Sequence, residues 1–154
     1  MSREPVVILL AEDDEGHAQL VQRNLKRAGI TNEVQRVEDG QLALDYVRRE
    51  GNFADRTRNG PLLVLLDINM PRIDGIEVLR QIKADTSLAT IPVIMLTTTD
   101  NPREIEACYQ LGCSIYITKP VEYEPFVEAI KRLGLFLQVV RVPRENQLPI
   151  GAAS

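Results

Sequence analysis

A chain of 154 residues, of which 44% are hydrophobic and 26% charged, is long enough to bury the core of one soluble domain. Its net charge of −4 argues against nucleic acid as the main partner, because a phosphate backbone selects basic surfaces. No apolar run approaches the ~18 residues of a membrane helix, and residues 1–5 do not resemble a signal peptide, so we expect a cytoplasmic protein that does not enter the membrane.

The chain alternates apolar runs of strand length with amphipathic stretches of helix length. Residues 6–11 form a continuous apolar run, which is typical of a parallel strand covered on both faces. A helix follows, because apolar residues recur at spacings of three and four up to Gly29, which we interpret as its C-cap. A more polar strand is predicted at 33–37 and a helix at 42–47, followed by a long surface loop at 51–61.

The second half of the chain continues the alternation. Residues 62–66 are the most apolar run and predict the central strand. The remaining predicted elements are a helix that closes near Asp85, a strand at 92–96, a helix at 102–111 capped by Gly112, a strand at 114–117 and a last helix from residue 122 to the high 130s. Five such repeats with right-handed crossovers predict an α/β fold, a doubly wound three-layer sandwich. We expect its five-stranded parallel sheet to be flavodoxin-like, with the order 2-1-3-4-5. We expect a single domain over 5–142 and a mobile tail over 143–154.

Polar residues follow four of the predicted strands at the point where each strand ends. They are Glu12-Asp13-Asp14, Asp67, Thr97-Thr98-Thr99 and Lys119-Pro120. The carboxyl ends of parallel strands form the crevice in which open α/β sheets bind ligands. Carboxylates crowded there repel one another unless a cation joins them, and their oxygens suit Mg²⁺. The pattern therefore predicts a site for one phosphoryl group and one divalent cation.

Four motifs occur along the chain: LLAEDD at 9–14, LLDINMP at 65–71 followed by Asp74-Gly75, LTT at 96–98 and YITKP at 116–120. In order and spacing they resemble the motifs of response-regulator receiver domains of two-component signalling, over roughly residues 5–140. Two further features more narrowly resemble the stand-alone regulators that are paired with cyanobacterial and bacterial phytochromes. One is the long loop around 51–54, and the other is the ending, which comprises 116–121 with Phe126 and then 136–143.

The resemblance implies a role for each acidic residue. Asp67 would be the phosphoacceptor, whose carboxylate becomes an acyl phosphate. Asp13 and Asp67 would bind Mg²⁺ directly and Glu12 would act through water, while the backbone carbonyl of Asn69 would complete the protein ligands. Asp14 matches no ligand position, and we interpret it as the N-cap of the first helix.

The resemblance also implies roles for three residues near the later strand ends. Thr97 would stand opposite Asp67 and bind a phosphoryl oxygen through its hydroxyl. Lys119 would be the cationic partner of Asp67 or of the phosphate, aimed by a cis bond to Pro120. Tyr116 resembles the rotating aromatic residue of the family, and its alternative interpretation is a half-buried tyrosine on an edge strand.

The one histidine, His17, is predicted on the first helix, away from its apolar stripe, and we do not expect it to carry a phosphoryl group. The phosphoryl donor is therefore expected to be another protein. The resemblance implies a sensor histidine kinase, with a bacteriophytochrome as one candidate. The protein would then be a single-domain response regulator, which catalyses only its own phosphorylation and dephosphorylation. Too few residues follow the last helix for a DNA-binding or catalytic effector, so it would signal by a change of its surface. The alternative function is a phosphorelay intermediate that passes the phosphoryl group to a histidine phosphotransfer protein.

Two other classes of protein fit the sequence less well. A magnesium phosphatase of the haloacid-dehalogenase type needs a second aspartate two residues after the nucleophile, where this chain has Asn69. A flavodoxin-like binding module needs a Ser/Thr/Gly-rich phosphate loop after the first strand, where this chain has three acids. Cys108 and Cys113 are interpreted as core thiols rather than a disulfide or a metal pair.

The last helix and the residues after it carry more apolar side chains than packing on one sheet face requires. One stripe is predicted to face the sheet, and it consists of Val127, Ile130, Gly134 and Leu137. A second set lies on an adjoining face and consists of Phe126, Leu133, Phe136 and Val140. We expect this second set to form a homodimer contact, because monomers rarely leave such a patch in water. The alternative is a tail that folds back over this face within one chain.

Overall fold

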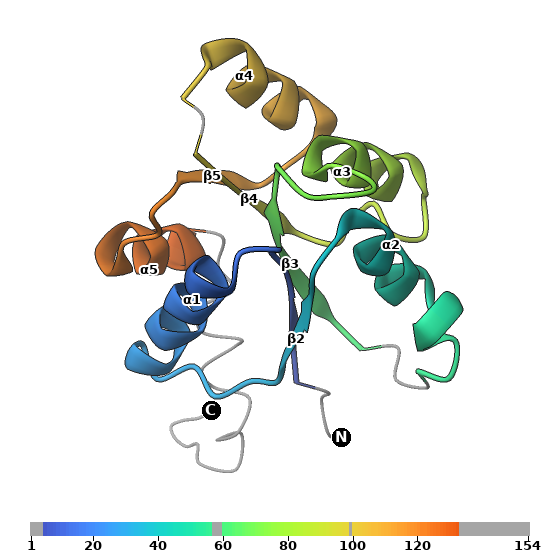
Figure 1. The fold of residues 1–154 in the computed structure, drawn as a ribbon, viewed down its shortest axis with the longest axis horizontal. Helices are drawn as coiled ribbons and strands as arrows, with labels where there is room; N and C mark the ends of the chain where they lie inside the picture. The colour runs from blue at the N-terminus through green and yellow to red at the C-terminus, as the bar shows by residue number, and fades with distance from the viewer. Residues whose placement is uncertain (1–4, 57–59, 99, 133–154) are drawn as a thin grey trace, which may run out of the picture.

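The computed structural model describes residues 5–56, 60–98 and 100–132. Within them, five parallel strands pair in the order β2-β1-β3-β4-β5, which confirms the predicted α/β fold and strand order (Figure 1). None of the described helices is long and apolar enough to cross a membrane. The elements in chain order are β1 (Val7–Ala11), α1 (Glu15–Arg27), β2 (Val34–Val37), α2 (Gly40–Arg48), the short 3₁₀ helix η1 (Gly51–Phe53), β3 (Leu62–Asp67), α3 (Gly75–Ala84), β4 (Val93–Thr97), α4 (Pro102–Leu111), β5 (Ile115–Thr118) and α5 (Tyr123–Arg132).

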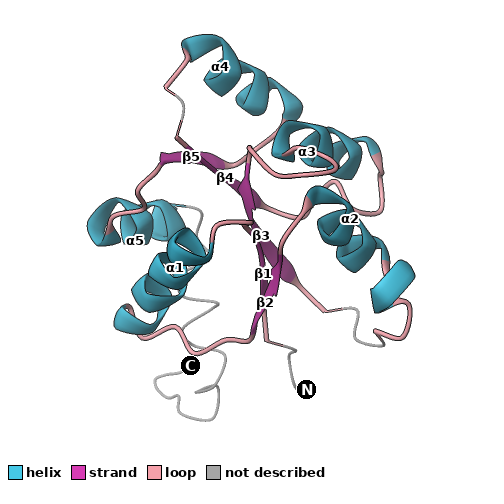
Figure 2. Ribbon diagram, in the orientation of Figure 1, coloured by secondary structure: helices cyan, strands magenta, loops and turns pink. Residues whose placement is uncertain are grey.

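The helices cover both faces of the sheet (Figure 2). α1 and α5 lie on one face, and α2, α3 and α4 lie on the other. Side chains of β1 alternate between the two sides: Ile8 and Leu10 pack in the cluster beneath α1 and α5, and Leu9 and Ala11 pack in the cluster beneath α2 and α3. β1 and β3 are buried along their whole length, as expected for strands covered on both faces. The sheet is therefore the middle layer of a three-layer sandwich.

Side-chain caps define where the first two helices begin. The carboxylate of Asp14 accepts a hydrogen bond of 2.8 Å from the backbone N–H of His17, which confirms Asp14 as the N-cap of α1. Asp39 accepts an equivalent bond of 2.8 Å from Leu42. Because of this cap, α2 begins at Gly40, two residues before its predicted start.

The strands extend slightly further than their apolar runs. β3 and β4 end on Asp67 and Thr97, one residue beyond the predicted ends, because Asp67 still pairs with Leu96 and Thr97 pairs with Thr118. β5 is likewise displaced by one residue from the predicted 114–117. The sheet itself therefore holds the polar residues at these ends.

The predicted packing of the last helix is wrong in one respect. The sequence places Phe126 on an exposed adjoining face, but its side chain is 0% exposed and packs in the core with Ala129 and Ile130. Val127, predicted to face the sheet, is half-buried. Since apolar residues occupy two adjoining stripes of this helix, periodicity alone does not fix which stripe turns inward. The predicted continuation of the helix, the later apolar residues and the tail at 143–154 lie outside the described residues.

α4 buries the fewest residues of the α-helices that the structure describes. Its bounds are as predicted, and it ends at Gly112, whose φ of 110° is left-handed. Cys108 is the one residue of α4 that is buried, and Tyr109 next to it is 48% exposed. This helix therefore attaches to the sheet through a narrow contact.

Close packing at two glycines brings neighbouring loops against the end of β3. A Cβ atom on Gly75 would lie 2.1 Å from the carbonyl oxygen of Asp67, so a larger residue would require a shift of the backbone. The N–H of Gly75 also donates to the carbonyl of Ile68 at 2.7 Å. A Cβ atom on Gly40 would lie 1.9 Å from the carbonyl oxygen of Ile73. The start of α3 is thus packed against the end of the strand that carries Asp67, and the start of α2 is packed against the loop that precedes α3.

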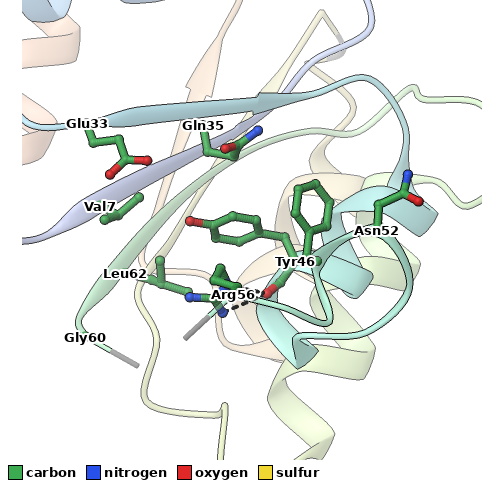
Figure 3. Close-up of a pocket in the computed structure, with 9 residues that line it drawn as sticks. Val7, Glu33, Gln35, Tyr46, Asn52, Arg56, Gly60 and Leu62 are labelled. Carbon is green, nitrogen blue, oxygen red and sulfur yellow. Dashed lines mark hydrogen bonds between the residues drawn. The ribbon is translucent and has the colours of Figure 1, made fainter. Parts of the chain in front are cut away.

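A hollow of about 250 Å³ lies at the opposite edge of the sheet, near the amino ends of β1 and β3 (Figure 3). Beside it, the ring of Phe53 packs edge-on against the ring of Tyr46, with centroids 5.0 Å apart. The guanidinium of Arg56 lies over the Tyr46 ring, 4.2 Å from its centroid, and Nη2 donates to the Tyr46 carbonyl at 2.7 Å. These contacts hold residues 51–56, the first part of the predicted loop, against α2.

Candidate functional site

Buried polar side chains gather at the carboxyl edge of the sheet. In the described part of the chain, the buried polar or charged residues are Glu12, Asn24, Asp67 and Thr97. Glu12 follows β1, while Asp67 and Thr97 are the last residues of β3 and β4. Burial of such groups costs stability unless they are partnered, so their concentration at one edge indicates a binding or reaction site.

Lys119 joins two of these buried carboxylates. It follows β5, and its Nζ lies 2.8 Å from Oε1 of Glu12 and 3.1 Å from Oδ1 of Asp67. Its side chain is only 5% exposed, so little water screens the two ion pairs. The bond from Lys119 to Pro120 is cis, as the resemblance implies. The ends of β1, β3 and β5 therefore meet at one ammonium group.

Three carboxylates in this cluster lie close enough to share a cation. One oxygen from each of Glu12, Asp13 and Asp67 lies within 4.8 Å of the other two. Lys119 supplies a single positive charge against these three acids, and an all-oxygen donor set suits a hard cation such as Mg²⁺. Asn69, predicted to add its backbone carbonyl, lies in the loop after β3 with an exposed side chain. The residues present fit the predicted metal.

Burial and neighbouring charge change the acidity of Asp67. Burial is the larger effect and the charge of Glu12 the next, and together they raise the pKa of Asp67 to about 7 even though Lys119 acts in the opposite direction. A carboxyl group with such a pKa holds a proton through much of the acidic range. A divalent cation and a proton would therefore compete for Asp67.

Thr97 and Tyr116 form a pair on adjacent strands. Thr97 is fully buried at the end of β4, and Tyr116 is half-buried on β5, where it pairs with Met95. Burial raises the pKa of the Tyr116 hydroxyl above its usual value, and a side-chain hydrogen bond with Thr97 acts in the opposite direction. A threonine on the strand next to that of Asp67 is thus connected to an aromatic residue on the edge strand.

Two residues that the motifs do not include hold the backbone around the site. Arg36 of β2 donates from Nε and Nη2 to the carbonyl oxygen of Glu12, at 3.0 and 2.8 Å. Asn24 of α1 donates from Nδ2 to the carbonyl oxygen of Val121 at 2.9 Å. Asn24 has a signal in the sequence, because it is a polar residue on the apolar side of its helix. Arg36 has none, since a single arginine on a polar edge strand is usually solvated.

Four candidate residues from the sequence stay outside the cluster of ion pairs. Asp14 caps α1, and Nδ1 of His17 lies 3.7 Å from its Oδ1. Cys108 and Cys113 are buried free thiols, as predicted. Burial raises the pKa of Cys113 to about 12, so this thiol is protonated at neutral pH.

The chain matches known proteins over most of its length. A model of the protein family described as "Response regulator receiver domain" matches residues 8–131. The "Probable methanogenesis regulatory protein FilR2" of Methanothrix harundinacea is 39% identical over 138 residues, which are 87% of this chain and 86% of that protein. The "Response regulator Rcp1" of Synechocystis is 36% identical over 143 residues, which are 92% of this chain and 96% of that protein.

Solved structures are similar as well. "Bacteriophytochrome response regulator RtBRR" matches with a TM-score of 0.78 and 42% identity, covering 87% of this chain and 79% of the other. The Mn²⁺-bound form of response regulator Rcp1 matches with a TM-score of 0.71 and 34% identity, covering 95% of this chain and 100% of the other. The structural similarity therefore covers most of the chain.

Proposed function

Because this chain belongs to the response regulator receiver domain family, we propose that it accepts a phosphoryl group from a sensor histidine kinase on Asp67. The position of Asp67 carries the proposal. It ends β3, the middle strand of the sheet, and is buried. One of its oxygens lies 3.1 Å from Lys119, and the acids Glu12 and Asp13 lie beside it.

The proposed reaction transfers a phosphoryl group between two side chains. A carboxylate oxygen of Asp67 attacks the phosphorus of a phosphohistidine in line, and the O–P bond forms as the P–N bond breaks. The electron pair of the broken bond stays with the imidazole, which takes up a proton from water. Asp67 reacts as the carboxylate, and with a pKa of about 7 it is partly protonated at neutral pH. Lys119 would exchange its contact with Asp67 for one with a phosphoryl oxygen.

Mg²⁺ is the proposed cofactor. Asp13, Asp67 and the backbone carbonyl of Asn69 would hold it, with Glu12 acting through water. When bound, it would neutralise negative charge on the phosphoryl oxygens. The all-oxygen donor set supports this choice, as does the relative Rcp1, whose structure has been solved with Mn²⁺, an ion with similar oxygen preference.

The pair formed by Thr97 and Tyr116 is the proposed route of the signal. The Thr97 hydroxyl would bind a phosphoryl oxygen on Asp67, and its displacement would change the position of Tyr116 on the edge strand. The surface formed by α4, β5 and α5 would then prefer a different partner. The contact between the two side chains supports this route.

A phytochrome-type histidine kinase is the proposed donor. The support is the similarity to a solved bacteriophytochrome response regulator, which is 42% identical. Phosphotransfer from purified histidine kinases of the host tests this assignment. Rapid transfer from a phytochrome kinase and slow transfer from the others is the expected result.

A homodimer through the residues that follow α5 is also proposed. The support is the amino-acid sequence, in which Leu133, Phe136 and Val140 recur at near-helical spacing outside the described residues. Sedimentation of the wild type beside a Phe136→Asp, Val140→Asp double variant tests it. A wild type that stays monomeric at high micromolar concentration, phosphorylated or not, contradicts the dimer.

Chemical phosphorylation tests the nucleophile directly. With Mg²⁺ and acetyl phosphate, the wild type should gain a phosphoryl group that hydroxylamine removes, and Asp67→Asn should gain none. Asp14→Asn is the matched control, because Asp14 is a neighbouring acid that only caps α1, and asparagine also caps helices. That control should label like the wild type. Equal labelling of Asp67→Asn would show that the nucleophile is a different residue.

A further inference from the structure

Arg36 fastens the backbone of the loop that carries the proposed metal ligands. It lies on β2, and its guanidinium reaches across to the residues after β1. Nε and Nη2 donate hydrogen bonds of 3.0 and 2.8 Å to the same atom, the carbonyl oxygen of Glu12. Nη1 forms an ion pair of 2.6 Å with Glu15, the first residue of α1. One planar group therefore holds both ends of the loop between β1 and α1.

Glu12 has a partner at each of its polar atoms. Its backbone N–H donates to the carbonyl of Val37 at 3.0 Å, just where the pairing of β1 with β2 ends. Its Oε2 accepts from the N–H of Asp14 at 3.1 Å, and its Oε1 pairs with Lys119 at 2.8 Å. Arg36 supplies the donors for the remaining atom, the carbonyl oxygen. Since a guanidinium is a rigid fork, this contact sets the orientation of the peptide that joins Glu12 to the next ligand.

We propose that Arg36 is a positioning residue for the divalent cation, because it holds the carboxylates of Glu12 and Asp13 at the separation that a cation needs. This role rests on the proposed Mg²⁺ site and adds to it a residue on a strand that contributes no ligand. The Arg36 side chain is 18% exposed, so its hydrogen bonds are largely shielded from water.

Charge and positioning by Arg36 have opposite effects on affinity for a cation. A guanidinium near the site repels Mg²⁺, so a role through charge alone predicts tighter binding when the charge is removed. A positioning role predicts weaker Mg²⁺ binding when the two hydrogen bonds to the carbonyl of Glu12 are removed, whether or not the positive charge remains. The sign of the change in affinity therefore separates the two roles.

Two substitutions of Arg36 test the inference. Arg36→Met removes the charge and the planar guanidinium and keeps an apolar side chain. Arg36→Lys keeps the charge but loses the planar guanidinium with its paired donors. The dissociation constant for Mg²⁺ is measured by isothermal titration calorimetry at pH 8, and the thermal midpoint of each protein is measured in EDTA. Both variants should bind Mg²⁺ more weakly, by ~10-fold, as is typical when a residue that orients a metal ligand is lost.

Glu15→Gln is the matched control. It removes the ion pair with Arg36 but leaves the two hydrogen bonds to the carbonyl of Glu12, so its affinity for Mg²⁺ should stay within ~2-fold of the wild type. Unchanged affinity in Arg36→Lys, or tighter binding in Arg36→Met, would overturn the inference. If Arg36→Met does not fold, Arg36→Lys decides alone. A wild type that binds no Mg²⁺ would instead overturn the proposed metal site.

Discussion

The side-chain amide of Asn24 in α1 donates a hydrogen bond of 2.9 Å to the backbone carbonyl of Val121, 97 residues later in the chain. One turn further along α1, the guanidinium carbon of Arg27 lies 3.9 Å from the centroid of the Tyr123 ring. Both contacts join α1 to the residues after Lys119, one at Val121 and the other at Tyr123, where α5 begins. The helix that begins beside the acidic loop therefore also holds the segment that follows the lysine.

Replacement of Asn24 should destabilise the fold. Asn24→Ala leaves the carbonyl of Val121 without this donor, and we expect a loss of about 1–3 kcal/mol in the free energy of unfolding, measured by urea denaturation. Arg23→Ala is the matched control, because Arg23 is exposed on the same helix, and it should change stability by less than ~0.5 kcal/mol. Equal effects of the two substitutions would contradict a structural role for this hydrogen bond.

Asp67→Asn should stabilise the metal-free protein at high pH. Because the pKa of Asp67 is raised to about 7 in the folded protein, ionisation of this group opposes folding progressively as the pH rises from about 4 to 7. At pH 8 in EDTA the variant should be more stable by about 1–2 kcal/mol. The advantage should fade toward pH 4. Thermal midpoints across this range test it, and a pH-independent difference would contradict it.

Lys119→Ala should separate metal binding from signal transmission. Without its ammonium group the acids still bind Mg²⁺, and more tightly, since a competing positive charge has gone. The phosphoryl group loses its cationic partner, so most of the response to phosphorylation should disappear. Amide exchange in α4 and α5, with and without a phosphodonor, measures this response. Lys26→Ala, on the exposed side of α1, is the control and should respond normally.

Gly75→Ala should be destabilising, whereas Gly16→Ala should not. A Cβ atom on Gly75 would collide with the backbone of Asp67, and relief of such a clash costs about 1–3 kcal/mol. At Gly16, in α1, the nearest atom is the flexible Asp14 carboxylate at 3.3 Å, so alanine should be neutral or stabilise by up to ~1 kcal/mol. Denaturant midpoints of the two variants measure the difference. Gly75→Ala should also slow the phosphorylation of Asp67 by acetyl phosphate.

The fold and the strand-end acids could be predicted because their signals are local. A parallel strand covered on both faces must be apolar throughout, so the runs that end before Glu12 and Asp67 identify β1 and β3. A polar residue directly after such a run must then lie at the edge of the sheet. The helix caps follow from the same logic, since Asp14 and Gly112 interrupt the periodic pattern at helix ends.

The supporting contacts could not be predicted because they depend on side-chain direction across the sheet. Arg36 reaches Glu12 only because β2 pairs with β1 in a register that no local pattern in either strand reveals. The inward face of α5 could not be predicted either, since Phe126 and Val127 are both apolar and only the packed structure shows which one enters the core. Asn24 can be recognised in the sequence as a polar residue on an apolar stripe, but its partner, the carbonyl of Val121, cannot.

The shallow attachment of α4 has an evolutionary consequence. Cys108 is the one buried residue of this helix, and Leu111 packs against the core at its end, so most of the remaining surface can accept substitutions that leave the sheet and the geometry of Asp67 intact. Duplicate copies of such a gene can diverge along α4 and come to serve separate circuits. Each copy would keep the inherited chemistry at Asp67 and bind a different partner protein through α4.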